Sequence, residues 1–323
     1  MKVYLGVDGG GTKTDFLLID TSGQVLASHR AGSAYYPETG IDGLQAMLAA
    51  GAEATLLRAG VPAKELAFAF IGLPAYGEDS KLLPRLDAIA TGVLPAGHYR
   101  CGNDMVCGWA GALAGRDGIS VVAGTGSIAY GEFESRSARA GGWGELFGDE
   151  GSAYWLAREA LTVFSRMSDG REPKSLLYQL IREHFQLGAD IDLCGAVYGP
   201  PALARSEIAA LAPLVAQAAH AGDAAAHRLL ERAAQELTAV VDAVRDQLGV
   251  PPQTLLPVSY SGGMFSMHGL LRQMLKAKLG AGKRSYQFVE PLLPPVVGAA
   301  LHAAKLDGLK ISAEFLGRIG RHR

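Results

Sequence analysis

The first residues whose types and spacing could do chemistry form the stretch Asp8-Gly9-Gly10-Gly11-Thr12, near the start of the chain. Three glycines let the backbone take positive φ and let its N–H groups approach a phosphate without a Cβ in the way. Asp8 supplies a carboxylate suited to holding Mg²⁺ directly or through water. The stretch predicts a metal ligand at Asp8 and a nucleotide-binding turn whose contacts are Gly10, Gly11, Thr12 and Lys13.

The residues after this turn separate it from two better-known glycine loops. The dinucleotide pattern G-x-G-x-x-G passes from a strand into a helix, whereas residues 14–19 form an apolar strand pattern. The P-loop needs an adjacent Gly-Lys pair, which Gly11-Thr12-Lys13-Thr14 lacks. What remains is a strand, a glycine turn and a second strand, with an ordinary tight hairpin as the structural alternative.

The same unit of strand, turn and strand returns in residues 118–133, with Thr125 and Gly126 in its turn. A third glycine turn, at Gly262 and Gly263, follows another predicted strand. A repeated supersecondary unit predicts two similar halves with a cleft between them. Two such hairpins could hold the β- and γ-phosphates of ATP, and the third turn could lie against the α-phosphate or adenosine. Phosphoryl transfer then needs Mg²⁺ and a base.

A candidate base, Asp104, follows Asn103 at the end of a short predicted strand. A carboxylate here could orient and deprotonate a hydroxyl nucleophile. The alternative is a helix N-cap, because Asp is a favoured capping residue and a helix is predicted from Met105. A carboxylate fully committed to capping would be a poor base.

A glycine-rich loop with one tryptophan and three carboxylates, two of them the adjacent Asp149 and Glu150, lies before the helix expected near residue 152. Its sequence is Gly141-Gly-Trp-Gly-Glu-Leu-Phe-Gly-Asp-Glu-Gly-Ser152. Carboxylates accept hydrogen bonds from hydroxyl groups, so the loop could form a polyol site that orients a substrate. Two structural interpretations stay open: Trp143 packs beneath its own loop, or Asp149 and Glu150 only place negative charge at the helix N-terminus.

Composition narrows the class of protein. The chain has 323 residues, 49% hydrophobic and 19% charged, with a formal net charge of −2; this predicts a two-domain globular protein without a nucleic-acid partner. We expect no export signal, and no membrane partner because no apolar run approaches the roughly 20 residues of a membrane span. Three cysteines, at 101, 107 and 194, are too few for a disulfide framework or a zinc site, which favours a reducing cytoplasm.

The periodicity of apolar residues predicts an α/β fold in which strands place these turns. Further strands are expected at 66–73 and 99–103, alternating with helices. A domain boundary is expected near 112–116. Helices are predicted over 41–60, 79–92, 105–114, 151–168, 173–187, 204–221, 223–248 and 294–304.

Together these motifs resemble the N-acetylglucosamine kinase-like branch of the BadF/BadG/BcrA/BcrD ATPase family, within the actin-like, sugar kinase and Hsp70 superfamily. The matching segments span almost the whole chain. They are Asp8-Gly-Gly-Gly-Thr12, Asn103-Asp104, Gly124-Thr-Gly-Ser127, Gly141-Gly-Trp-Gly144, Gly148-Asp-Glu-Gly-Ser-Ala-Tyr-Trp155, Ile208-Ala209 with Leu211-Ala-Pro213, Ser261-Gly-Gly263, and Pro295 with Gly298-Ala299.

The resemblance implies two ribonuclease-H-like domains, residues 1–113 with about 293–323, and 114–292 with a helical insertion. It implies that the final helix completes the first domain, and that a homodimer forms. It also implies particular roles for residues. Thr12 and Thr125 would contact ATP, Ala209 would lie near adenosine, and Asp104 would be the base for a sugar 6-hydroxyl; Ser127, Gly142, Trp143, Gly144 and Asp149 would line the sugar.

Two positions depart from the family pattern. In the first sugar-contacting loop, beside Ser33, the resembling kinases have an asparagine where this chain has Tyr35, and after the second core strand they have a serine where it has Pro74. Both changes remove small polar partners, and a site built to hydrogen-bond a hydroxyl or amide discriminates strongly on such groups. Kinase chemistry is therefore better supported than the particular sugar.

The sequence thus predicts an ATP- and Mg²⁺-dependent kinase of the 6-hydroxyl of an amino sugar. N-acetylglucosamine is the favoured acceptor, with glucosamine or N-acetylmuramic acid as alternatives. A dehydratase-activating ATPase is disfavoured because the cysteines have no spacing suited to a shared iron–sulfur cluster. A non-catalytic sugar-responsive regulator is disfavoured because Asp104 is present and no sequence is spare for a helix-turn-helix domain.

Overall fold

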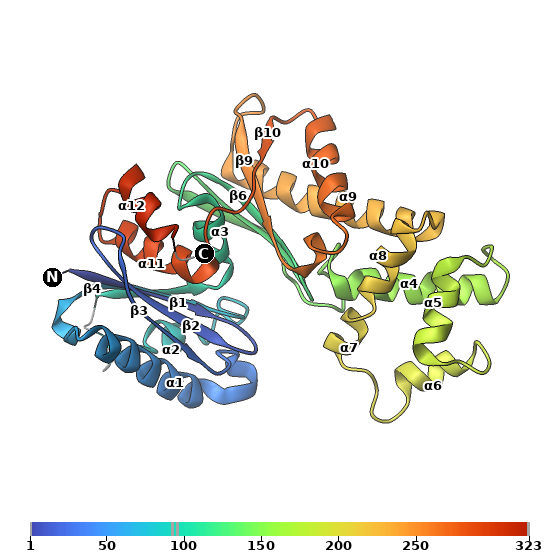
Figure 1. The fold of residues 1–323 in the computed structure, drawn as a ribbon, viewed down its shortest axis with the longest axis horizontal. Coiled ribbons are helices and arrows are strands. Elements are labelled where there is room, and N and C mark those ends of the chain that lie inside the picture. The colour runs from blue at the N-terminus through green and yellow to red at the C-terminus, as the bar shows by residue number, and fades with distance from the viewer. Residues whose placement is uncertain (1, 92–93, 95–96, 322–323) are drawn as a thin grey trace. The chain divides into compact units, whose positions relative to one another are not determined.

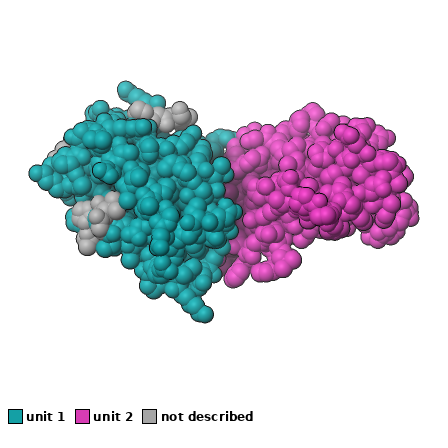
Figure 2. All heavy atoms as spheres, turned by 90° about the horizontal axis from the view of Figure 1, so that it is seen from below, with its two compact units in different colours: residues 1–117, 290–323 teal, residues 118–289 magenta. Residues whose placement is uncertain are grey.

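The computed structural model describes residues 2–91, 94 and 97–321. The chain divides into two compact units: unit 1 comprises residues 1–117 and 290–323, and unit 2 comprises residues 118–289 (Figure 2). Each unit contains a five-stranded sheet covered by helices (Figure 1). No described helix combines the length and apolar character that crossing a bilayer requires.

The two sheets share one topology, which confirms the predicted α/β fold with two similar halves. The sheet of unit 1 has the order β3-β2-β1-β4-β5, and that of unit 2 has the order β10-β9-β6-β7-β8. In both, the first three strands in sequence pair antiparallel and the last two add in parallel. The strands are β1 (Val3–Gly9), β2 (Thr14–Asp20), β3 (Val25–Ala31), β4 (Leu66–Leu73), β5 (Tyr99–Asn103), β6 (Gly118–Ala123), β7 (Ser127–Phe133), β8 (Arg136–Gly141), β9 (Leu256–Ser261) and β10 (Tyr286–Phe288).

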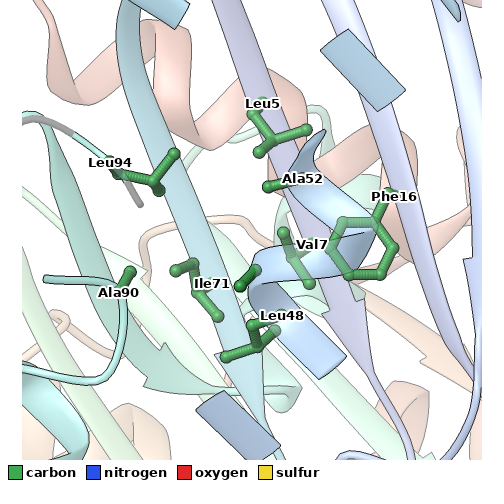
Figure 3. Close-up of a pocket in the computed structure, with 9 residues that line it drawn as sticks. Leu5, Val7, Phe16, Leu48, Ala52, Ile71, Ala90 and Leu94 are labelled. Atoms are coloured by element: carbon green, nitrogen blue, oxygen red, sulfur yellow. The ribbon is translucent and has the colours of Figure 1, made fainter. Parts of the chain in front are cut away.

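Successive residues of β1 point to opposite faces of the unit 1 sheet, as the period of a strand requires. Leu5 and Val7 face helix α1 (Tyr36–Ala59), and together with Leu48 they line a small apolar pocket in the core of the unit (Figure 3). Gly6 faces helix α11 (Pro295–Leu306), where an added Cβ would lie 2.2 Å from the backbone nitrogen of Ala300. The apolar pocket therefore belongs to the core and contains none of the predicted site residues.

Helix α11 also packs against α3 (Met105–Leu113), so the end of the chain completes unit 1. The contact is close: a Cβ on Gly298 would lie 2.1 Å from the backbone nitrogen of Gly111. The approaching chain is joined to α3 through backbone hydrogen bonds, in which Leu292 and Leu293 donate to Ala112 and Gly111 at 3.1 Å. Small residues on the face of α11 thus allow two helix backbones to touch. The remaining helical segments of unit 1 are η1 (Ala63–Glu65), α2 (Leu83–Asp87) and α12 (Ala313–Ile319).

Unit 2 has its core between its sheet and the long helix α9 (Ala224–Leu248), which contacts β6, β7 and β8. The N-cap of α9 is Asp223, whose carboxylate accepts hydrogen bonds from the backbone of Ala225 and Ala226 and from Leu177. The cap therefore also joins α9 to a neighbouring helix. The other helical segments are α4 (Ala153–Ser168), α5 (Leu176–Phe185), α6 (Asp192–Tyr198), α7 (Arg205–Ala209), α8 (Ala212–His220), η2 (Gly263–Phe265) and α10 (Leu270–Ala281).

Several predicted helices differ from the observed ones. The helix predicted over 79–92 is wrong: only Leu83–Asp87 is helical among its described residues, and its predicted end at 92 lies outside them. The single helix predicted over 204–221 is two helices, because Pro213 occupies the first turn of α8 and starts a new helix. Helix α1 begins at Tyr36 rather than 41, with Pro37 in its first turn and a non-helical Gly40 within it.

Candidate functional site

The carboxyl edge of the unit 1 sheet brings Asp8 and Asp104 together. Asp8 lies near the end of β1, beside Gly72 of β4, and Gly72 in turn pairs with Gly102 of β5. Asp104 follows β5 directly, and its backbone N–H donates to the carbonyl of Leu73 at 3.2 Å. Because the carboxyl ends of parallel strands share one edge, two aspartates from distant parts of the sequence meet there.

Both carboxyl groups titrate above the ordinary range of an aspartate. Burial, together with the charges of Asp104 and Asp15, raises the pKa of Asp8 to about 7, against the opposing effects of the Cys107 hydrogen bond and the charge of Lys13. Burial is also the main reason that the pKa of Asp104 is raised to about 6, a value that already includes the lowering effect of backbone N–H groups at Met105 and Asp104. A raised carboxyl pKa at a sheet edge is typical of a group that works as a base near neutral pH.

Asp104 stands at the N-cap position of α3, but its side chain does not cap the helix. Asn103 takes this part instead: its Oδ1 accepts a hydrogen bond from the backbone N–H of Met105 at 3.1 Å, and its Nδ2 donates to the carbonyl of Tyr76 at 3.2 Å. The alternative interpretation of Asp104 as a capping residue is therefore wrong. Its carboxylate keeps hydrogen-bonding capacity for a ligand.

A buried thiol lies beneath this pair. Cys107, on the first turn of α3, contacts the backbone carbonyl of Val7 through its Sγ at 3.6 Å, and it hydrogen-bonds Asp8. The space below Asp8 is tight, because a Cβ on Gly72 would lie 2.3 Å from this sulfur. Burial and the two nearby aspartates raise the pKa of Cys107, so the thiol stays protonated and can donate to Asp8.

The first glycine turn, residues 10–13, leads from β1 into β2 on the same edge. Thr12 and Lys13 are exposed, and Lys13 forms an ion pair with Asp15, with 3.5 Å between Nζ and Oδ2. The carbonyl of Gly10 accepts a hydrogen bond from the backbone N–H of Ala34 at 2.9 Å. The turn is thus fixed at its base, while Gly11 and Thr12 at its tip are exposed.

The two departures from the family pattern both lie next to this turn. A Cβ on Gly9 would come within 2.9 Å of the Ala34 Cβ and 3.3 Å of the Pro74 Cδ. Tyr35 follows Ala34, and its backbone N–H donates to the Ser33 Oγ at 3.0 Å. The structure therefore places the loop of Ser33 and Tyr35, as well as Pro74, beside the predicted phosphate turn.

The donor set of this edge fits a magnesium ion held with a nucleotide. Magnesium is usually bound by one or two carboxylates together with water and phosphate oxygens, not by a cage of protein ligands. Asp8 offers such a carboxylate, and the neighbouring charges of Asp104 and Asp15 oppose its ionisation in a way that a cation would relieve. Among the residues that the structure describes, no group of three His, Cys, Asp or Glu side chains is placed to hold a metal ion.

In unit 2 the second glycine turn is anchored on helix α4. The carbonyls of Gly124 and Thr125 accept backbone hydrogen bonds from Ala153 at 2.8 Å and Tyr154 at 3.3 Å. Ser127 begins β7, and its Oγ donates to the carbonyl of Glu150 at 2.7 Å. The hydroxyl of Ser127 is thus engaged with the backbone, whereas Thr125 is exposed at the turn.

The third glycine turn lies against the second. A Cβ on Gly262 would lie 2.2 Å from the carbonyl oxygen of Ala123, at the end of β6, and its φ of 104° is strained for other residues. Gly263 follows and begins η2. Gly262 and Gly263 are exposed, and Ala209 is buried at the end of α7. The structure brings the second and third turns together.

The tryptophan loop is open to solvent at its tip. Trp143 is 67% exposed, Leu146 83% and Phe147 72%, so the interpretation of Trp143 as a buried anchor is wrong. Gly142 and Gly144 have positive φ, 70° and 89°, and give the loop its tight course. The Trp143 side chain is available to a ligand.

Asp149 is the best-buried carboxylate of this loop, at 3% exposure. Its φ of 57° is in the left-handed region, and it forms an ion pair with Arg205, the first residue of α7. Helix capping is done by Ser152, whose Oγ accepts from the backbone N–H of Trp155 at 3.1 Å. Burial raises the pKa of Asp149, and Arg205 is the largest opposing influence.

Two residues of the site were not anticipated from the sequence. Arg205 and Cys107 reach their aspartate partners only through the folded chain, 56 and 99 positions apart. A lone arginine or cysteine carries no local pattern, so no signal in the sequence would have singled out either residue.

The strand order and the three glycine turns define the class of protein as a two-part, actin-like sugar kinase fold. The chain belongs to the BadF/BadG/BcrA/BcrD ATPase family, whose family model matches residues 5–303. The predicted family is therefore confirmed.

Three known proteins illustrate the similarity. An N-acetyl-D-glucosamine kinase of Dictyostelium discoideum is 30% identical over 313 residues, 94% of this chain and 98% of that protein. An N-acetylmuramic acid/N-acetylglucosamine kinase of Clostridium acetobutylicum is 30% identical over 269 residues, 82% and 86% of the two chains. A crystal structure from Chromobacterium violaceum, provisionally named an N-acetylglucosamine kinase, has a TM-score of 0.72 and 28% identity, and covers 94% of this chain and 99% of that one.

Proposed function

We propose that this protein is an ATP-dependent amino sugar kinase that phosphorylates the 6-hydroxyl of N-acetylglucosamine. The observation that carries the proposal is Asp104: a carboxylate of raised pKa, released from capping by Asn103, in a chain 30% identical to an N-acetyl-D-glucosamine kinase along 94% of its length. Because the similarity covers 94% of this chain and 98% of that protein, it supports the same overall reaction for both and not only the same nucleotide binding.

The chemistry assigned to unit 1 depends on its sheet edge. Asp104 would accept the proton of the sugar hydroxyl as the oxygen attacks the γ-phosphorus, so that the P–O bond to ADP breaks as the new one forms. Asp8 would hold Mg²⁺, which supplies positive charge for the phosphate oxygens. Gly10, Gly11, Thr12 and Lys13 would donate hydrogen bonds to phosphates, and Ser33 and Tyr35 would border the sugar.

Unit 2 would supply the remaining contacts. Its second and third turns would bind the nucleotide through Thr125, Gly126, Gly262 and Gly263, with Ala209 near adenosine. The tryptophan loop would bind the sugar: Trp143 offers an exposed apolar face to a pyranose ring, and Asp149 accepts a hydroxyl hydrogen bond. The other proposed sugar contacts are Ser127, Gly142 and Gly144.

The two units would serve as the two ATPase domains, the first carrying the base and the second carrying the helical insertion. Three free cysteines, two of them buried, agree with a cytoplasmic protein. The family resemblance also favours a homodimer, which light scattering coupled to gel filtration would test.

The test is a coupled assay of ADP release with Mg²⁺ and ATP against a panel of sugars: N-acetylglucosamine, glucosamine, N-acetylmannosamine, N-acetylmuramic acid and glucose. We expect the highest kcat/KM for N-acetylglucosamine. A preference for glucosamine or N-acetylmuramic acid would show that Tyr35 and Pro74 redirect the site. Binding of ATP and sugar without turnover of any sugar in the panel would contradict the enzyme assignment and favour a regulatory role.

A further inference from the structure

Arg205 connects helix α7 to the tryptophan loop through two carboxylates. Its Nη2 bonds the Oδ2 of Asp149, and its Nε lies 3.3 Å from the Oε2 of Glu145. The two partners differ in their surroundings, because the Asp149 side chain is 4% exposed and that of Glu145 is 43% exposed. An exposed ion pair contributes little, whereas removing one partner of a buried pair is costly. The bond to Asp149 is therefore the important one.

The other groups around Asp149 fix the position of its carboxylate. Backbone N–H groups of Ser127 and Gly144 donate to it, so that the second glycine turn and the tryptophan loop both converge on this side chain. The left-handed φ of Asp149 is unusual for a residue other than glycine, and such a conformation persists only where its surroundings hold it. Arg205 is the only side-chain cation within ion-pair distance of Asp149 among the described residues.

The ion pair lies directly on the second glycine turn. A Cβ on Gly126 would come within 2.8 Å of the Arg205 Nη2 and within 2.8 Å of the Asp149 Oδ2. The absence of a side chain at Gly126 thus leaves the space in which guanidinium and carboxylate meet. Arg205 also begins the short helix α7, which ends at Ala209.

We propose that Arg205 is a positioning residue for sugar recognition, which holds the Asp149 carboxylate ionised and in place to accept a hydrogen bond from a hydroxyl of a neutral sugar. This inference rests on the proposed sugar kinase function. The guanidinium acts through Asp149 and contacts neither the sugar nor the phosphates. Because Asp149 and Glu145 together outweigh the single charge of Arg205, the site favours an uncharged acceptor over one that carries a carboxylate.

The test compares Arg205→Met, which removes the charge at similar volume, with Arg205→Lys, which keeps it. We expect Arg205→Met to raise the KM of the sugar by on the order of tenfold, because it leaves the buried Asp149 carboxylate without its partner, although the Arg205 side chain itself is 40% exposed; the KM of ATP should stay within about twofold of wild type. The KM of the sugar for Arg205→Lys should lie between the values for wild type and Arg205→Met. A suitable control is Arg166→Met, because Arg166 pairs with Glu172 at 2.7 Å elsewhere in unit 2; its kinetics should match wild type.

A double-mutant cycle with Asp149→Asn identifies the route of the effect. If Arg205 acts through Asp149, Arg205→Met should change the sugar KM by less than about threefold when Asp149 is already Asn. Additive effects in this cycle would overturn the inference. So would an ATP KM that rises as much as the sugar KM, because the guanidinium would then bind phosphate itself.

Sugar binding measured by calorimetry without nucleotide separates this inference from the proposed function. If the wild-type protein binds N-acetylglucosamine but does not phosphorylate it, the kinase assignment is contradicted. The double-mutant cycle can then use the dissociation constant of the sugar in place of its KM. A wild type that phosphorylates the sugar while Arg205→Met keeps a normal sugar KM would overturn only the role of Arg205. If Arg205→Met does not fold, the inference can still be tested with Arg205→Lys, provided that this variant is fully folded.

Discussion

At the carboxyl edge of the unit 1 sheet, burial and then the nearby charge of Asp104 raise the pKa of Asp8. Asp8 lies in β1 and Asp104 directly follows β5, and the strand β4, with Gly72, runs between β1 and β5. Two like charges in a buried place are unfavourable for folding. Their proximity instead suits a reaction in which one carboxylate holds a cation and the other accepts a proton.

Replacing the proposed base should abolish most turnover while nucleotide binding persists. We expect Asp104→Asn to lower kcat by about 10²–10⁴-fold, the usual contribution of a general base. Steady-state kinetics and binding of a fluorescent ATP analogue are the measurements. Asp42→Asn is the control, because that side chain is 98% exposed. Near-normal turnover of Asp104→Asn would remove Asp104 from the mechanism.

The reaction should slow in mild acid. A base works only when deprotonated, and the pKa of Asp104 is raised to about 6 and that of Asp8 to about 7. The kcat/KM for the sugar should therefore reach a plateau in alkaline solution and decrease as the pH falls through this range. A profile that stays flat between about pH 5 and pH 8 would contradict both assignments.

Removing the charge of Asp8 should stabilise the protein without ligand in alkaline solution. The folded-state pKa of Asp8, about 7, lies above its ordinary value of 3.8, so its stabilising contribution is present below 3.8 and is lost as the pH rises through 7. We expect Asp8→Asn to raise the free energy of unfolding by about 1–4 kcal/mol at pH 8 in a chelator. The gain should shrink at pH 5. Urea unfolding at both pH values measures it, and an Asp8→Asn protein less stable than wild type at pH 8 would contradict the origin of the shift.

The close contact of α11 with α3 should not tolerate a methyl group. Gly298→Ala would place its Cβ 2.1 Å from the Gly111 nitrogen, and such overpacking costs about 1–3 kcal/mol or more. Gly317→Ala is a matched control: it lies in α12 with nothing within 4 Å of an added Cβ, and it should gain about 0.5–1 kcal/mol. The measurement is the thermal unfolding midpoint of each variant. Equal midpoints for Gly298→Ala and Gly317→Ala would show that α11 and α3 can move apart without cost.

Thiol reactivity should distinguish the three cysteines. Cys194 is exposed, whereas Cys101 and Cys107 are buried, and burial raises the pKa of Cys101 to about 12. A thiolate is the reactive form, so an aromatic disulfide reagent at pH 8 should modify one group quickly and all three only after unfolding. Cys194→Ser should remove the fast phase. Fast modification of Cys107 in the native protein would show that the space beneath Asp8 opens readily.

Local patterns predicted much of the fold. Strand β4 was predicted with its observed bounds, because Leu66–Leu73 is a continuous apolar run ended by Pro74. The edge strands β3 and β8 were not anticipated. Their sequences, Val25–Ala31 and Arg136–Gly141, are polar and only partly buried, so they have neither the apolar run of a central strand nor a strict alternation. These two strands are positioned by hydrogen bonding to their neighbours, β2 and β7. A local sequence pattern does not reveal such pairing.

In the candidate site, too, some features could be predicted from local sequence and others could not. The three glycine turns and Asp104 could be located from the sequence, because each follows an apolar strand. What surrounds them could not: that Asn103 replaces Asp104 as the helix cap, and that Arg205 meets Asp149, depend on contacts across the folded chain. The roles assigned to these residues in binding ATP and sugar stay predictions.

The return of α11 to unit 1 also orders events during synthesis. Unit 2 is a single uninterrupted segment, residues 118–289, and can close its core as soon as that segment has left the ribosome. Unit 1 begins first but must keep the α11 side of β1, including Gly6, uncovered until Ala300 arrives. A nascent chain therefore carries an unfinished first unit until α11 has been synthesised, and truncation before Pro295 would leave that face of β1 without its helix.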